Sequence, residues 1–99
     1  MKMAEFKASL SGAAPAPGLD APVAALWWAA RGHWDEAHKI VQDEASADAA
    51  WVHAYLHRVE GDLGNAGYWY RQAGKPVAAG SLETEWERIA SQLLGSTRA

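Results

Sequence analysis

The sequence has 99 residues, of which 49% are hydrophobic and 21% charged, a balance typical of one globular domain. Its formal net charge of -3 leaves no excess of lysine and arginine to neutralise a phosphate backbone, so nucleic-acid binding is not expected. The absence of cysteine excludes disulfides, thiolate nucleophiles and cysteine-ligated zinc.

No stretch of the sequence approaches the roughly 18 uncharged apolar residues that a membrane span needs. The first residues contain lysine but are followed by no continuous apolar segment of signal-peptide length. These features predict a cytoplasmic protein that does not interact with membranes.

The N-terminal residues 1–18 are predicted to form a flexible arm. Residues 8–18 are rich in Ser, Ala, Gly and Pro, and no helix is expected to run through Pro15 and Pro17. Phe6 and Leu10 are expected to anchor the arm on the body, and docking of a partner is the alternative.

Two helices with a glycine between them are predicted next. Asp20 is placed to cap a first helix that runs over 23–31 and contains two adjacent tryptophans. Gly32 supplies a left-handed residue that ends this helix, and residues 34–41 form the second. The spacing predicts a tight helical hairpin.

The same pattern follows in the next thirty residues. Asp48 is predicted to cap a helix over 49–60, Gly61 to end it, and Asp62 to cap a fourth helix over 63–73. A second hairpin is therefore expected.

A final helix is predicted after the break at residues 74–76. Ser81 is its expected cap and Gly95 its end, and residues 96–99 are expected to fray. The helical-repeat domain thus covers residues 19–95. The apolar stripe of this helix consists of Leu82, Trp86, Ile89, Leu93 and Leu94.

The two hairpins repeat with a period of 29, the difference between Gly32 and Gly61. One hairpin cannot bury its own apolar face and must stack on a neighbour. Four further pairs keep this register: Ala25 with Ala54, Trp34 with Leu63, Ala37 with Ala66, and Val41 with Tyr70.

Residues 21–73 resemble the tetratricopeptide repeat family. The resemblance lies in Gly-His-Trp-Asp-Glu-Ala at 32–37 and, more loosely, in Gly-Asp-Leu-Gly-Asn-Ala at 61–66. It implies antiparallel helical hairpins that bind a protein or peptide and do not catalyse a reaction. The period is shorter than the family's roughly 34 residues, and two units stand where about three are usual, so the final helix is predicted to replace the third unit as a cap.

Two segments, 50–58 and 67–74, also resemble a group of small uncharacterised bacterial and fungal proteins. This resemblance implies no activity.

His53, His57 and Glu60 form the predicted metal or acid-base site. They are spaced so that all three project from one face of the 49–60 helix, and two imidazoles one turn apart can hold one metal ion. The alternative is a pair of packed histidines, each with one nitrogen hydrogen-bonded, beside residues of the following helix. Leu63, Ala66 and Tyr70 are the neighbours that the repeat alignment predicts.

Trp51, Tyr55 and Arg58 share another face of the same predicted helix. On a tetratricopeptide-like fold this face lines the inner groove, and aromatic and arginine side chains are enriched where binding energy concentrates. They are the predicted partner-binding residues, with packing of Trp51 and Tyr55 against the first hairpin as the alternative.

The adjacent Trp27 and Trp28 point about 100 degrees apart on a helix, so one stripe does not bury both. They suggest a homodimer contact.

The leading functional prediction is a non-enzymatic module that binds a protein, a peptide or a second copy of itself, with no cofactor. No Ser-His-Asp order or glycine-rich phosphate loop is present, and no catalytic residues are assigned. The alternative is a metal- or small-ligand-binding protein, or an enzyme, that uses the histidine site with a divalent metal such as zinc.

Overall fold

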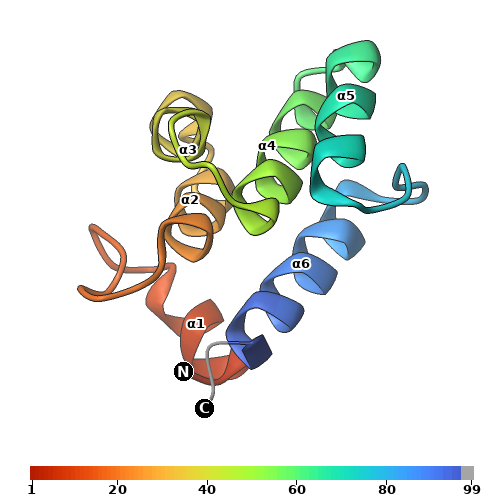
Figure 1. Ribbon diagram of the computed structural model, residues 1–99. Coiled ribbons are helices and arrows are strands. Elements are labelled where there is room, and N and C mark those ends of the chain that lie inside the picture. Colours follow the sequence, from red (N-terminus) through yellow and green to blue (C-terminus); the bar gives the residue numbers. More distant parts are fainter. Residues whose placement is uncertain (97–99) are drawn as a thin grey trace.

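The computed structural model describes residues 1–96, and all regular structure in this range is α-helical, as the sequence predicts (Figure 1). In chain order, its six helices are α1 (Met3–Ser9), α2 (Ala21–Ala30), α3 (Trp34–Gln42), α4 (Ala47–Val59), α5 (Leu63–Ala73) and α6 (Leu82–Ser96). In this part of the chain no helix combines the length and apolar character needed to cross a bilayer.

Two helical hairpins, α2–α3 and α4–α5, form the centre of the molecule. Gly32 and Gly61 end the first helix of each hairpin with φ of +80° and +86°, a region that glycine enters without steric cost. The N–H of the next residue, His33 or Asp62, donates to the carbonyl five residues earlier at 3.0 or 2.9 Å. The predicted repeat is therefore present in the backbone of both turns.

Small residues are buried at equivalent positions of the two hairpins. Helices approach closely where an alanine replaces a larger side chain, and the buried alanines hold positions that the 29-residue period relates. The 29-residue period does not predict burial at the pair Trp34 and Leu63. Trp34 packs on α4, whereas Leu63 is 69% exposed. The buried alanines are Ala25 and Ala54 in the first helices, and Ala37 and Ala66 in the second.

The caps of the later helices follow the sequence with one correction. Asp62 accepts a hydrogen bond from the N–H of Asn65 at 3.2 Å, as predicted. The predicted cap Asp48 is wrong, because α4 begins earlier and the hydroxyl of Ser46 accepts from the N–H of Ala49 at 3.1 Å. Asp48 instead lies in the first turn, where its charge faces the positive end of the helix.

Helix α6 packs across α2 and α4, the first helices of the two hairpins (Figure 1). Its stripe from Trp86 to Leu94 is buried, and the indole N–H of Trp86 donates to the carbonyl of Leu26 at 2.8 Å. The helix extends one residue beyond the predicted end at Gly95. Of the predicted frayed tail 96–99, the last three residues lie outside the described range.

The predicted N-terminal arm contains a short helix, α1, that Phe6 anchors on the body. Phe6 is fully buried and stacks on Trp86 with 5.7 Å between ring centroids. The hydroxyl of Ser9 accepts from the indole N–H of Trp27 at 3.1 Å. The prolines that argue against a helix in residues 1–18 stand only at 15 and 17, so they leave the earlier residues free to form α1.

Candidate metal centre

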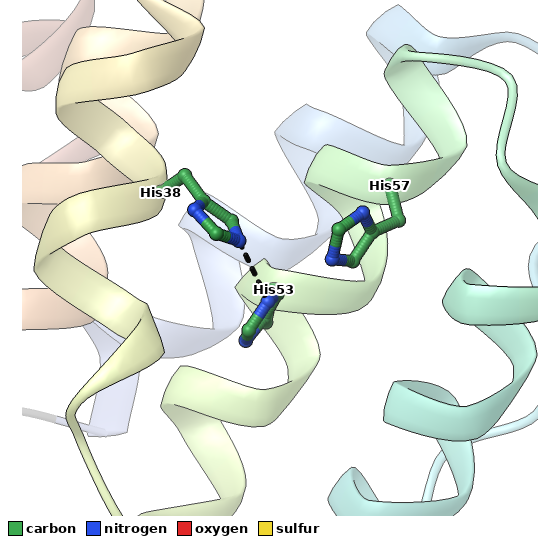
Figure 2. A group of neighbouring side chains, drawn as sticks. All are labelled: His38, His53 and His57. Atoms are coloured by element: carbon green, nitrogen blue, oxygen red, sulfur yellow. Dashed lines mark hydrogen bonds between the residues drawn. The ribbon is translucent and has the colours of Figure 1, made fainter.

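Three histidines converge between the two hairpins. His38 comes from α3, and His53 and His57 come from α4 (Figure 2). The Nε2 atoms of His38 and His53 lie 3.0 Å apart, and one ring nitrogen from each of the three histidines lies within 4.8 Å of the others. The site predicted from the sequence contained His53 and His57 but not His38.

Helical spacing produces this convergence. His53 and His57 are one turn apart on α4, and their rings stack with centroids 4.8 Å apart. On α3, Trp34 and His38 have the same spacing and stack at 4.7 Å. The indole N–H of Trp34 donates to the carbonyl of Leu56 at 2.7 Å, which fixes the Trp34–His38 pair against α4.

A second indole encloses the cluster from α5. Trp69 stacks on His53 with 4.0 Å between centroids and an angle of 14° between the rings. His53 and His57 are only 4% and 6% exposed, whereas His38 is half-buried. The cluster thus lies in an aromatic, weakly polar setting that solvent reaches on the side of His38.

Glu60 orients His57. The Nδ1 of His57 lies 2.6 Å from the Glu60 carboxylate, and a neutral imidazole in this contact donates its Nδ1–H and keeps its lone pair on Nε2. This Nε2 points toward His38 and His53 (Figure 2). The predicted set of His53, His57 and Glu60 therefore divides into two facing histidines and a carboxylate behind one of them.

His53 has one nitrogen without a partner among the described residues. Its Nε2 forms a hydrogen bond with the Nε2 of His38, and its Nδ1 is buried with no hydrogen bond. A buried polar atom without a partner costs about 1–3 kcal/mol, so this nitrogen lowers the stability of the folded chain.

Burial also favours the neutral form of two of the three histidines. It lowers the pKa of His53 to about 4, and the nearby His38 and His57 contribute to the same shift. Burial, followed by the proximity of His57, lowers the pKa of His38. Near pH 7 the imidazoles of His38 and His53 are therefore uncharged, which is the form that coordinates a metal ion.

The spacing of the nitrogens approaches that of a metal site. Nitrogen ligands at about 2.1 Å from a tetrahedral ion lie about 3.4 Å from one another. The 3.0 Å between the Nε2 atoms of His38 and His53 is about 0.4 Å shorter than this separation, and all three ligand nitrogens lie within 4.8 Å of one another.

The neighbours of the histidines differ from those that the repeat alignment predicts. Trp69 takes the place expected for Tyr70, because Tyr70 turns to the other side of α5 and donates to Glu85. Leu63 is largely exposed. The alignment of the two hairpins predicts the backbone, but it does not predict which aromatic side chain packs on the neighbouring helix.

The position of His38 in the cluster could have been predicted from the sequence. One face of α3 is marked by residues three or four positions apart, namely Trp34, Ala37, His38 and Val41. Two of them, Ala37 and Val41, are buried. A histidine within such a stripe faces the neighbouring helix. The repeat alignment gives no such indication, since residue 67 of the second hairpin is a glycine.

The predicted binding residues face α6 and the segment before it. Trp51 and Tyr55 are 6% and 7% exposed, and the Nζ of Lys75 lies 4.2 Å from the Trp51 ring centroid. Burial, with Glu85 nearby, raises the pKa of Tyr55 to about 12. This face is largely covered by the chain itself.

Arg58 joins a buried polar network instead of solvent. Its guanidinium donates to Glu85 at 2.9 Å and to the carbonyl of Gly80. Tyr70 donates its hydroxyl to the same carboxylate, and burial followed by this hydrogen bond raises the pKa of Tyr70. The network fixes the start of α6 against α4 and α5.

The proposed dimer contact is not an exposed pair. Trp27 is fully buried and Trp28 is half-buried, with its ring edge-on to His33 at 5.5 Å. The tryptophans therefore pack on different parts of the same chain.

Comparison with protein-family models, curated proteins and solved structures found no match. The fold and the histidine cluster define the class of the molecule: an all-helical domain of two hairpins and flanking helices with three facing imidazoles between the hairpins.

Proposed function

We propose that this protein binds one divalent transition-metal ion through His38, His53 and His57, with Glu60 orienting His57. The observation that carries the proposal is the convergence of three buried or half-buried imidazole nitrogens within 4.8 Å. Chance spacing on one helix accounts for two of them, but the third comes from a different hairpin.

The ligand set favours zinc and similar ions. Imidazole suits zinc, copper and nickel, whereas magnesium and calcium prefer carboxylate and carbonyl oxygens. The hydrogen bond from His57 to Glu60 matches the usual outer support of a metal-bound histidine, which donates its second nitrogen to a carboxylate.

A metal ion at this position would link the two hairpins. His38 belongs to the first hairpin and the other proposed ligands belong to the second, so binding would add a link to the packing and the Trp34–Leu56 hydrogen bond that already join them. Binding free energy then adds to the free energy of unfolding.

A tetratricopeptide-like interaction module is the alternative proposal. It is supported by the two glycine turns and the period of 29. It is weakened because α6 covers Trp51 and Tyr55, the residues proposed to meet a partner.

The test is a zinc titration of the full chain in competition with a chromophoric chelator. We expect one zinc per chain, and His38→Ala should lower the affinity by more than about 100-fold, since even outer-shell changes cost 10–100-fold. His38 is half-buried, so this variant should still fold. His33→Ala is the matched control, because His33 is exposed and outside the cluster.

Equal zinc affinity in the wild type and in His38→Ala would exclude the site. Loss of binding in both variants would show that His33 also contributes and that the ligand set is wrong.

A further inference from the structure

The histidine cluster provides three ligands and no fourth. Among the described residues, no other histidine, aspartate or glutamate brings a ligand atom within 4.8 Å of all three imidazoles. Glu60 and Asp62 form a separate group with His57 on the other side of its ring. Zinc sites closed by protein have four ligands, whereas sites with three protein ligands keep a position for water or another molecule.

The charges around the cluster favour an anion at that position. Three neutral imidazoles do not offset the two positive charges of a divalent ion. The carboxylate of Glu60, bonded to His57, is the one anionic group in hydrogen-bond contact with the trio in the described part of the chain. The indole rings of Trp34 and Trp69 stack on His38 and His53, and a weakly polar environment strengthens the attraction of an ion for an anion.

The packing limits the size of that anion. His53 and His57 are nearly inaccessible to solvent, and access is left on the side of the half-buried His38. Because the rings of Trp34 and Trp69 stack on His38 and His53, a ligand with one donor atom and a narrow body suits this position better than a bulky one.

We infer that the three-histidine centre, once it holds a metal ion, keeps one exchangeable position that takes a small monodentate anion such as hydroxide or azide. This inference rests on the proposed metal site and adds a ligand class to it. The tightly packed imidazoles hold the ion, and the anion binds to the ion alone.

The experiment uses the full chain loaded with Co²⁺ and freed of excess metal by gel filtration. Cobalt bands in the visible spectrum respond to changes in coordination, so the spectrum reports the fourth position directly. Sodium azide is then titrated in a chloride-free buffer, and retained cobalt is measured after a second filtration. His33→Ala serves as the control that should behave as the wild type does.

We expect a saturable spectral change at one azide per cobalt, with the metal retained. If cobalt is retained and azide leaves the spectrum unchanged, the exchangeable position is refuted while the metal site stands. If azide removes the cobalt, the position is likewise refuted. If cobalt is not retained, or is retained equally by His38→Ala, both the metal site and this inference fail.

Discussion

The hydrogen bond between His57 and Glu60 decides which nitrogen of His57 faces the cluster. Glu60→Gln keeps the shape of the side chain but removes the negative charge that holds the Nδ1–H. We predict a 10- to 100-fold loss of zinc affinity, the usual effect of changing such an outer ligand. Competition titration measures it.

The control for this substitution is Glu83→Gln, an exposed residue at the start of α6. Unchanged zinc affinity in Glu60→Gln would show that His57 does not depend on Glu60 for its orientation.

His53 makes the metal-free protein sensitive to acid. Its pKa is about 4 in the folded chain and near 6.5 when unfolded, so the unfolded state binds the proton more readily. This histidine's contribution to stability is complete above pH 6.5 and is lost as the pH falls to 4, by roughly 3 kcal/mol. Urea denaturation between pH 7.5 and about 4 in the presence of a chelator measures the loss.

His53→Phe removes this titration and should flatten the acid part of the stability curve, leaving the smaller effect of His38. The same acid sensitivity in His53→Phe and wild type would show that another group is responsible.

Removal of a tyrosine hydroxyl at two positions, one buried and one exposed, tests the network of Arg58, Glu85 and Tyr70. Tyr70→Phe removes the donor to Glu85, a buried carboxylate, and should lower the free energy of unfolding by about 1.5–3 kcal/mol. Tyr68→Phe, on the exposed side of the same helix, should change it by less than about 0.5 kcal/mol. Equal effects of the two changes in chemical denaturation would contradict the assigned role of the network.

At the level of elements, α5 is intrinsically weak because two glycines, Gly64 and Gly67, lie inside it. A Cβ at Gly64 meets no atom within 4 Å, so Gly64→Ala should stabilise the protein by about 1 kcal/mol. Gly61→Ala also has space, but its φ of +86° is left-handed and should cost about 1–2 kcal/mol. Urea midpoints that move in the same direction for both would contradict the backbone assignment.

The helices and their turns were largely predictable because their signals are local. The two glycines that end helices, Gly32 and Gly61, have the predicted left-handed backbone. The two caps, Asp62 and Ser81, accept the predicted hydrogen bonds from N–H groups three residues later. The sequence did not identify Ser46 as the cap of α4, because Ser46 and Asp48 lie two residues apart and either side chain can accept the capping hydrogen bond.

The candidate site was only half predictable because its third histidine comes from a different hairpin. His53 and His57 share a helix, so their spacing reveals them, but contact with His38 depends on how the hairpins pack. The packing of α6 on the α4 face that carries Trp51 is also a long-range contact, and no local sequence pattern predicts it.

On the scale of the whole molecule, a metal ion at the histidines would join two hairpins that share one hydrophobic core. Free zinc at 100 times the dissociation constant would add about 2.7 kcal/mol to stability. For a domain of this size, this corresponds to a rise of roughly 10–20 °C in Tm.

Metal content together with the melting temperature tests this account most directly. The purified native chain would be analysed for metals, and its Tm measured before and after removal of metal with a chelator. The account predicts about one equivalent of transition metal and a fall of roughly 10 °C or more on chelation, restored by zinc. A chain without metal, whose Tm changes with neither chelator nor added zinc, would contradict it.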